Sequence, residues 1–470
     1  MSYKLSELIE SKAKEEQTQI LTEQGQLTGG VSFLPIQEWF FKLVEDGYVG
    51  DLNHWNQSFL IRVPELDTGL LEQSIRLLIE KHDAFRMYYP KENNTYTQQY
   101  GIEYTTKIKD LDISGVPSED LSGIFTEWQS RFDIENGPLF QIAYVHGFKD
   151  RSARIFFALH HLIIDAVSWR IITEDLKNIY QTLEKGNHPE VYLKGSSYRQ
   201  WTDAVKGYLL DNPEARNKEL VYWNNTTENV IRSNDVLTEL SSSGYHFANL
   251  SLEENYTEKL IREVHHIYHT QINDILLSAL ASALSDLTGE SGHTVLLEGH
   301  GREDLFNNLD ITETVGWFTS MYPLLLKTGK NIQDTIVITK ESLRSIPNNG
   351  IGYGSLVGYI QQALPKISFN YLGQLDQEEN TGEKTWYISG ENSGNSMGDK
   401  NRDSYIISVN GAIADGQLRF GISGYLSQDQ VNRLTQKFGD YIKQAVDELT
   451  VEERTWLTPS DTENIVGKIS

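Results

Sequence analysis

The stretch RIFFALHHLIIDAVSWR (residues 154–170) decides how the rest of the chain is interpreted. Its apolar run ends on two consecutive histidines, His160 and His161, and Asp165 follows just before an amphipathic helix. This pattern predicts a strand that delivers imidazole side chains to a turn. Histidine is the side chain best suited to proton transfer near neutral pH, and a strand end holds it rigidly. A buried carboxylate at Asp165 would need a partner, because an unpaired charge inside a protein is costly.

Two simpler interpretations of histidine pairs are open at this point. A pair is often structural, and we expect this for His265 and His266, which lie in a helical pattern with Thr270 where a carboxylate would be needed. A metal site at His160 and His161 is disfavoured, because adjacent strand residues point to opposite faces and cannot easily share one ion. For the same reason, only one of these two histidines can face a given cavity.

The composition excludes several classes of protein. With 470 residues the chain exceeds the size at which one hydrophobic core stops growing, so two domains are expected. Its 41 basic and 66 acidic residues give a net charge of −25, which argues against a nucleic-acid partner. The absence of cysteine excludes a thiol nucleophile, disulfides and thiolate zinc sites, and it is consistent with a cytoplasmic location. Any thioester chemistry must therefore use a thiol that belongs to the substrate.

Neither secretion nor a membrane span is predicted. Residues 1–17 are rich in lysine and glutamate and contain no apolar core of a signal peptide, and no stretch approaches eighteen apolar residues.

Strand and helix patterns mix along the whole chain, which predicts an α/β or α+β fold. Residues 1–30 predict a helical tail and a linker, and two halves of similar element order follow at 31–210 and 211–450. Residues 451–470 are expected to be a C-terminal linker. Residues 374–400 are polar and rich in glycine and asparagine, so they predict a surface loop.

Two further motifs carry glycine. Glu298 follows a short buried strand and opens EGHGRE (residues 298–303), where a backbone could approach a ligand closely, although a salt bridge to Arg302 is the simple alternative. GIGYG (residues 350–354) lacks the following lysine and the strand-to-helix setting of a phosphate loop, so a nucleotide site is rejected. Its glycines predict a tight turn or a close backbone approach.

Six ordered motifs together resemble the condensation-domain superfamily of nonribosomal peptide synthetases and, within it, the epimerization domains, from about residue 31 to residue 449. They are LPIQEWFF (34–41), HHLIIDAVSWR (160–170), EGHGRE (298–303), VGWFTSMYP (315–323), GIGYG (350–354) and FNYLGQ (369–374). Condensation members usually have glycine after the motif's aspartate, whereas this chain has Ala166. That departure favours epimerization over peptide-bond formation.

The resemblance implies two chloramphenicol-acetyltransferase-like subdomains with mixed sheets that form a V-shaped cleft, with a channel between them. It implies an aminoacyl or peptidyl thioester on the phosphopantetheine arm of a carrier protein as the substrate, and inversion of its α-carbon from L to D as the reaction. The domain itself would bind no cofactor and no metal. The expected partners are a carrier domain upstream, whose last helix residues 3–13 resemble, and the condensation domain of the next module downstream.

The resemblance also assigns the proton-transfer residues. Inversion requires a proton to leave one face of the α-carbon and another to reach the opposite face, so one group is needed on each side of the cleft. His161 and Glu298, one from each half, are the expected pair. His160 is expected to be a packed or hydrogen-bonded neighbour of His161.

Five supporting roles follow from the same resemblance. Asp165 is expected to hold structure by pairing with Arg86, which lies in a segment resembling the family's second motif. Asn370 and Tyr371 are candidates for polar contacts with the thioester or the enolate, and Arg302 is a candidate for orienting Glu298.

Two rival functions remain. A condensation catalyst would use His161 on an attacking amine and should not need Glu298. A catalytically silent module that only docks carrier proteins belongs to a different class, but such a module has no use for titratable groups directed into a cleft. A monomer is assumed in each case.

Overall fold

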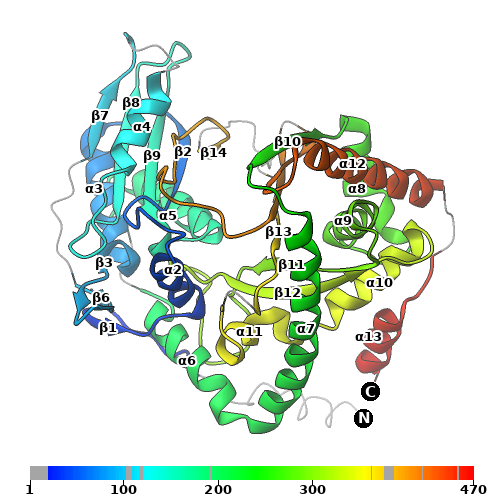
Figure 1. The fold of residues 1–470 in the computed structure, drawn as a ribbon. Helices are drawn as coiled ribbons and strands as arrows, with labels where there is room; N and C mark the ends of the chain where they lie inside the picture. Colours follow the sequence, from blue (N-terminus) through cyan, green and yellow to red (C-terminus); the bar gives the residue numbers. More distant parts are fainter. Residues whose placement is uncertain are drawn as a thin grey trace, which may run out of the picture.

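The structure, a computed structural model, describes residues 19–101, 108–115, 120–189, 193–360, 363–374, 386–414, 416–451 and 455–469. The side chains of 209–211 and 466–469 are outside this description, and so is the helix expected at residues 3–13. Figure 1 shows two lobes, each built on a sheet, that are joined along the lower part of the view.

The first lobe is built on a five-stranded mixed sheet with the order β14-β2-β9-β8-β7. Its elements are β2 (Asn56–Pro64), α3 (Thr68–Lys81), β7 (Lys109–Asp112), α4 (Leu121–Gln129), β8 (Phe140–His146), β9 (Ser152–His160), α5 (Ala166–Glu184) and β14 (Tyr387–Ser389). All nine residues of β9 are buried, because different helices cover its two faces. Phe156 stacks on Phe125 of α4, whereas Phe157 stacks on Phe59 on the face that α5 covers. This double burial explains the unbroken apolar run before the histidines.

Smaller elements join the first lobe to its neighbour. They are β1 (Gly29–Val31), α2 (Pro35–Glu45), η1 (Asp83–Arg86), β3 (Met87–Tyr88), β4 (Lys91–Glu92), β5 (Thr95–Tyr96) and β6 (Gln98–Tyr100). Pro35 occupies the first turn of α2, where its missing N–H leaves no hydrogen bond unmade. Helix α2 contacts β12 and α11 of the second lobe, so it lies at the junction between the lobes.

The second lobe is built on a six-stranded sheet with the order β10-β16-β15-β13-β11-β12. Its strands are β10 (His246–Ser251), β11 (Gly292–Gly299), β12 (Ser320–Lys327), β13 (Ile367–Gln374), β15 (Ile407–Ala414) and β16 (Gln417–Gly424). Its helices are α7 (Pro213–Leu240), α8 (Glu254–Arg262), α9 (Ile272–Thr288), α10 (Ile332–Arg344), α11 (Ile351–Leu356) and α12 (Gln428–Val451), with η4 (Val264–His266) and η5 (Pro347–Gly350). β11 pairs with β13, and β13 with β15, in parallel, whereas the remaining pairs are antiparallel. β15 and β16 form a hairpin in which Ala414 pairs with Gln417.

The connection between the lobes is helical. Helix α6 (Tyr198–Asp211) begins after its cap Ser197 and is followed at once by the 28-residue α7. The sequence gives no indication of α7, because this segment is polar and rich in asparagine and shows little amphipathic periodicity. Trp223, Val230 and Leu237 are fully buried on one side of α7, so tertiary packing holds this helix.

The second lobe returns a strand to the first. Residues 374–400 were predicted to be a surface loop, and this prediction is wrong for Tyr387–Ser389, which forms β14 and pairs with β2 at the edge of the first sheet. Glu391 then forms an ion pair with the buried Arg154, and Asn56 N donates to Ser396 O at 2.8 Å. The sequence does not show which strand this short run pairs with, and these contacts tie the two lobes together (Figure 1).

The glycines of 350–354 allow close approach between elements, as predicted. Gly350 has φ +82, and a Cβ there would overlap the ring of Tyr322. A Cβ on Gly352 would overlap the carboxylate of Glu219. The motif therefore packs α11 against β12 and α7.

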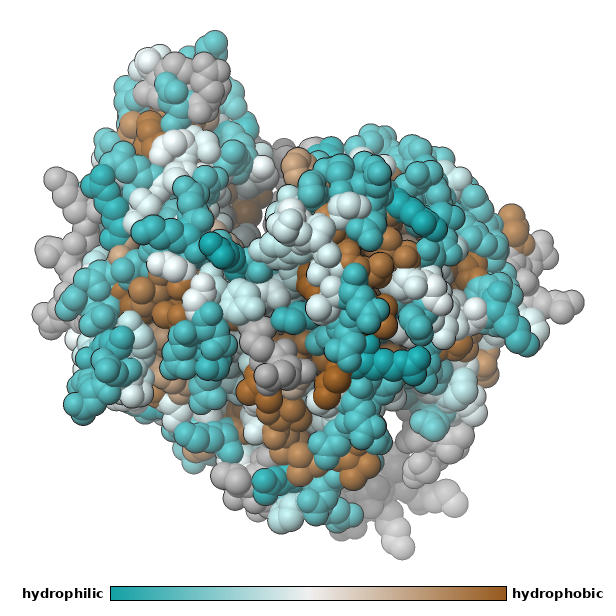
Figure 2. Space-filling model, viewed as in Figure 1, coloured by the Kyte–Doolittle hydropathy of each residue, from teal (hydrophilic) through white to brown (hydrophobic). Residues whose placement is uncertain are grey.

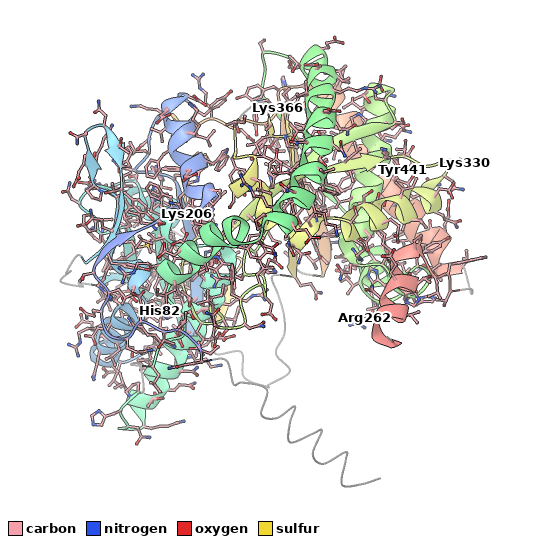
Figure 3. The ribbon with its side chains drawn as sticks, turned by 90° about the horizontal axis from the view of Figure 1, so that it is seen from below. His82, Lys206, Arg262, Lys330, Lys366 and Tyr441 are labelled. Carbon is pink, nitrogen blue, oxygen red and sulfur yellow. The ribbon has the colours of Figure 1, made fainter. Side chains whose placement is uncertain are left out.

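Two further views show how the lobes meet. Figure 2 shows a mostly hydrophilic face that is hollowed between the lobes at its upper edge. In Figure 3 His82 lies in the first lobe and Lys366 in the second, with Lys206 of α6 between them. A last helix, α13 (Pro459–Ile469), packs on α10 through the buried Lys340, whose ammonium group forms an ion pair with Asp461 at 2.7 Å.

Candidate active site

A cavity of about 550 Å³ lies where the two lobes meet. His161 from the first lobe and Glu298 from the second both line it, so the structure brings these two candidates together. Its wall at α2 is apolar, and its wall along the second sheet carries polar side chains among apolar ones. The apolar side chains include Ile36, Trp39, Leu43 and Trp55, and the polar ones include Ser368, Asn370, Ser408 and Asn410.

His161 is held by the end of β9 and by the second lobe. Its backbone N–H donates to Trp55 O at 2.8 Å, which extends the β2–β9 ladder by one more bond. Its ring centroid lies 4.4 Å from that of Trp317, and its Nε2 lies 2.8 Å from the side-chain amide nitrogen of Gln57. Burial lowers the pKa of His161 to about 4, so the ring is neutral near pH 7 and can accept a proton.

His160 points to the other side of the strand, as alternation predicted. Its Nε2 bonds to Leu52 O at 2.8 Å and its Nδ1 accepts from Leu162 N at 3.2 Å. Burial lowers the pKa of His160 to about 3. Both ring nitrogens are therefore satisfied in the neutral form, which makes His160 a structural residue at the turn. The pair His265 and His266 is bonded to Thr270 and to Glu263 O, and neither lines the cavity.

Glu298 is the next-to-last residue of β11 and belongs to a row of polar side chains across the sheet. The β11–β13 register places it beside Asn370, whose Nδ2 donates to Glu298 Oε2 at 3.5 Å, and Asn370 in turn pairs with Asn410 of β15. The carboxylate is open to the cavity but surrounded by protein atoms, and this desolvation raises the pKa of Glu298. It therefore holds a proton more readily than a carboxylate on the outer surface.

One of the candidate polar contacts needs correction. Tyr371 follows Asn370 on β13 and points to the opposite face, where its ring centroid lies 6.4 Å from that of the core residue Phe420. It does not line the cavity, because successive strand residues alternate. Asn410 and Tyr405 also line the cavity and were not among the predicted site residues. Their positions in the sequence give no indication of this, because the pairing of β13 with β15 brings this part of the chain to the cavity.

The partner predicted for Asp165 was wrong. Arg86 forms an ion pair with Asp83 and donates to Ile79 O at 2.8 Å. Asp165 instead pairs with Arg302 of the second lobe, whose Nη2 lies 3.2 Å and 3.3 Å from the two carboxylate oxygens. Asp165 also caps α5 by accepting from Ser168 N at 2.8 Å.

Arg302 consequently does not orient Glu298. Its guanidinium lies 3.8 Å from the ring centroid of Phe318 and donates to Ile311 O and Thr314 O at 3.1 Å and 2.7 Å. Asp165 Oδ2 accepts from Phe318 N at 3.1 Å. The pair of Asp165 and Arg302 thus fastens α5 of the first lobe to the loop of the second lobe that carries Trp317 onto His161.

Comparison with known proteins identifies the family to which this chain belongs. The condensation-domain family matches residues 29–465, which is most of the chain. The chain belongs to the condensation-domain family. The solved epimerization domain from the third module of tyrocidine synthetase B is 29% identical, with a TM-score of 0.77, and the match covers 92% of this chain and 99% of that one. The first condensation domain of the calcium-dependent antibiotic synthetase, 15% identical with a TM-score of 0.68, covers 91% of this chain and 98% of its own and supports the same fold.

The curated relatives of this condensation-family domain are much longer than it is. A linear gramicidin synthase of Brevibacillus parabrevis is 35% identical over 93% of the chain, and the chain spans 9% of that protein. N-(5-amino-5-carboxypentanoyl)-L-cysteinyl-D-valine synthase of Amycolatopsis lactamdurans is 36% identical over 85% of the chain, which spans 10% of it. The chain therefore corresponds to about a tenth of these nonribosomal peptide synthetases. The predicted family and the predicted α/β fold with mixed sheets are confirmed.

Neither a membrane span nor a metal site is found among the described residues. No helix there is both long and apolar enough to cross a membrane. No group of three or more histidine, aspartate or glutamate side chains in the same residues is arranged to hold a metal ion.

Gly301→Ala is expected to destabilise this condensation-family domain more than Gly289→Ala. Both glycines have a left-handed backbone, with φ +66 and φ +80, so alanine costs about 1–2 kcal/mol at either. At Gly289 the added methyl would meet open space, whereas at Gly301 it would overlap the carbonyl oxygen of Phe318, next to the loop that carries Trp317. Thermal unfolding of the two variants measures the difference, and equal losses of Tm would contradict the close approach.

Acidification is expected to destabilise the domain partly through His160. Its pKa is lowered to about 3 in the folded state, against about 6.5 in the unfolded chain, so the unfolded state binds more protons between these values. Above about pH 6.5 the titration of His160 does not reduce the free energy of unfolding. As the pH falls from about 6.5 toward 3, this titration reduces the free energy of unfolding by at most about 1.4 kcal/mol per pH unit.

A His160→Gln variant isolates this effect, since the amide can replace both ring hydrogen bonds and does not titrate. The Tm of wild type should exceed that of His160→Gln near pH 7, and the difference in Tm should be smaller at about pH 4. Parallel Tm curves for the two proteins would show that His160 is not the titrating group.

Proposed function

We propose that the domain inverts the α-carbon of an aminoacyl or peptidyl thioester carried on the phosphopantetheine arm of a carrier protein, and converts the L form to the D form. One observation carries the proposal: two proton-transfer side chains, His161 and Glu298, come from opposite lobes and line one cavity. A reaction that removes a proton from one face of a carbon and returns one to the other face needs this arrangement.

The chemistry follows from the acidity of a thioester's α-hydrogen. One enzyme group takes the proton, the Cα–H bond breaks, and its electron pair moves onto the carbonyl oxygen to give an enolate. The other group then delivers a proton to the opposite face and forms a new Cα–H bond with inverted configuration. His161 can accept a proton, because its pKa of about 4 keeps the ring neutral near pH 7, and Glu298 can donate one when it is protonated, a state that desolvation favours by raising its pKa. Exchange with water returns both groups to their starting states.

Polar side chains along the second sheet are placed to stabilise the enolate oxygen. Asn370 and Asn410 can donate from their side-chain amides, and Tyr405 lines the same cavity. Burial and the nearby charge of Glu298 raise the pKa of Tyr405 well above its usual value, so its hydroxyl stays protonated and remains a donor. Removal of one such donor from an active site commonly lowers the rate by about 10²–10³-fold.

The second candidate is a condensation catalyst, which the shared fold supports. It would need His161 near an attacking amine and would leave the carboxyl group of Glu298 without a role. Two observations favour epimerization: the acid on the opposite wall of the cavity, and the 29% identity to a solved epimerization domain over 92% of the chain. The carrier-docking module without activity would leave both titratable groups unexplained.

The wider setting is part of the same proposal. Because the relatives are multidomain synthetases, we place a carrier domain before this domain and a condensation domain after it. The phosphopantetheine arm arrives with the carrier as part of the substrate. We expect the assembly to act in the cytoplasm, without a cofactor or metal bound to this domain.

The test is α-proton exchange in heavy water with an L-aminoacyl carrier protein. Wild type should introduce deuterium at the α-carbon together with loss of L configuration. Peptide-bond formation with an added aminoacyl acceptor, without deuterium uptake, would favour condensation instead. Binding of the loaded carrier with neither reaction would leave only docking.

A further inference from the structure

The environment of His161 contains one polar partner that the reaction scheme above does not use. Gln57 lies on β2, which pairs with β9 so that Gln57 is opposite Leu159. Its side chain is therefore on the same face as His161, two residues further along the chain. The amide nitrogen of Gln57 lies 2.8 Å from Nε2 of His161, while the amide oxygen is buried and has no hydrogen-bond partner in the part of the chain that the structure describes.

We propose that Gln57 is a positioning residue that selects the tautomer of His161 with the proton on Nδ1 and the lone pair on Nε2. This inference rests on the proposed function for its catalytic meaning, but its structural content concerns the free domain. An amide NH₂ group can only donate, so the nitrogen it faces must accept. The neutral ring must then carry its proton on Nδ1, which is buried and has no hydrogen-bond partner among the described residues, so the orientation of the Gln57 amide decides the tautomer.

This choice of tautomer matters for proton transfer. Nε2 is the nitrogen that keeps a lone pair, so it is the base that takes the α-proton when the substrate displaces the amide. Once Nε2 has been protonated, an NH₂ group facing it is repulsive, and a half-turn of the Gln57 side-chain amide presents its unpartnered oxygen as the acceptor. The same side chain can therefore serve the neutral and the charged ring in turn.

The other charged and titratable groups around His161 do not supply this selection. Asp165 is committed to Arg302, Ser168 and Phe318 N, and His160 is bonded on both ring nitrogens on the far face of the strand. Glu298 lies on the sheet side of the cavity and bonds to Asn370.

The test reads the tautomer directly in the substrate-free domain. Long-range proton–nitrogen NMR spectra of the ¹⁵N-histidine-labelled protein distinguish the two tautomers, and a His161→Gln sample identifies the signal. Wild type should show a protonated Nδ1 and an unprotonated Nε2 near pH 7. Gln57→Leu, which removes the donor but keeps the bulk, should give a mixture of tautomers.

Gln57→Glu provides the opposite change. A carboxylate accepts rather than donates, so it should move the proton to Nε2 and raise the pKa of His161 by about one unit or more. The pH midpoint of α-proton exchange should rise by the same amount, with a loss that approaches tenfold only well below the new midpoint. Ser58→Ala, the next residue of β2, whose hydroxyl contacts Ser393 on the other face, is the matched control and should change neither reading.

The outcomes separate this inference from the proposed function. Wild-type tautomer and wild-type titration in both Gln57→Leu and Gln57→Glu would overturn it, provided that thermal unfolding shows both variants folded. The expected tautomers together with no α-proton exchange in wild type would support the role of Gln57 and reject epimerization.

Discussion

A Glu298→Gln domain is expected to lose inversion of the α-carbon by about 10²–10⁴-fold while it keeps its fold. The amide has the shape of the carboxyl group, and its oxygen can still accept from Asn370 Nδ2. It cannot take up or release a proton in the relevant pH range, so one face of the α-carbon loses its proton-transfer group. Conversion of an L-aminoacyl carrier to the D form, followed by chiral analysis after release from the carrier, measures the loss.

Deuterium uptake adds a second reading to the Glu298→Gln experiment. With His161 intact, any residual exchange should occur without inversion, because the proton leaves and returns on the same face. His161→Gln should lose inversion as strongly, and the double variant should be little worse than either single one, since the two groups act as a unit.

The control for Glu298→Gln lies in the same hexapeptide. Glu303 accepts from Asn349 Nδ2 at 2.6 Å and does not line the cavity. Glu303→Gln makes the same chemical change and should retain near-wild-type inversion. If Glu298→Gln and Glu303→Gln behave alike, the carboxyl group on the cavity wall is not the second proton-transfer group.

The sequence predicted the parts of the site that depend on short-range patterns. The apolar run before the histidines, the turn and the helix after Asp165 are β9, η3 (His161–Ile163) and α5. Strand alternation was enough to separate a buried His160 from a His161 at the cavity. Each of these features is fixed by neighbours a few residues away, so their periodicity is visible in the chain itself.

Features that depend on how strands pair could not be predicted in this way. Asn410 joins Glu298 and Asn370 only because β15 lies beside β13, and the distance in sequence gives no indication of that pairing. Tyr371 is the neighbour of Asn370 in the motif, yet the pleat of the strand turns it to the opposite face, where it packs half-buried against the core. The residues that return to the first sheet as β14 form a short aromatic and apolar run inside a polar segment, and nothing in the chain shows that this run pairs with β2.

The ion pair of Asp165 shows why a plausible partner can be wrong. Arg86 was chosen because it lies in a motif-like segment of the same half. In the structure a carboxylate three residues before it, Asp83, satisfies it locally, whereas the partner of Asp165 comes from 137 residues further along the chain. Charge and motif order identify groups that need partners, but only the packing of the two lobes decides which groups meet.

Asp165→Asn is expected to destabilise the domain by about 3–5 kcal/mol, because it leaves the buried guanidinium of Arg302 without its counter-charge. Only 5% of the Asp165 side chain and 8% of the Arg302 side chain are exposed. Asparagine is also a good helix cap, so the start of α5 is preserved and the loss reports the charge. Denaturant unfolding measures the free energy, and inversion should fall as well, because the same pair fixes the loop that packs Trp317 on His161.

A double-mutant cycle decides which arginine is the partner of Asp165. Arg302→Met alone leaves the carboxylate buried and unpaired, whereas Asp165→Asn combined with Arg302→Met leaves no buried charge, so the double variant should be more stable than the sum of the single losses predicts. Arg86→Met is the matched control: it breaks a buried pair with Asp83 in the first lobe, and Asp165→Asn should add to its loss without any rescue. Rescue of Arg86→Met, but not of Arg302→Met, would return the partnership to the residue that the sequence favoured and would remove the link between the lobes on which the placement of His161 depends.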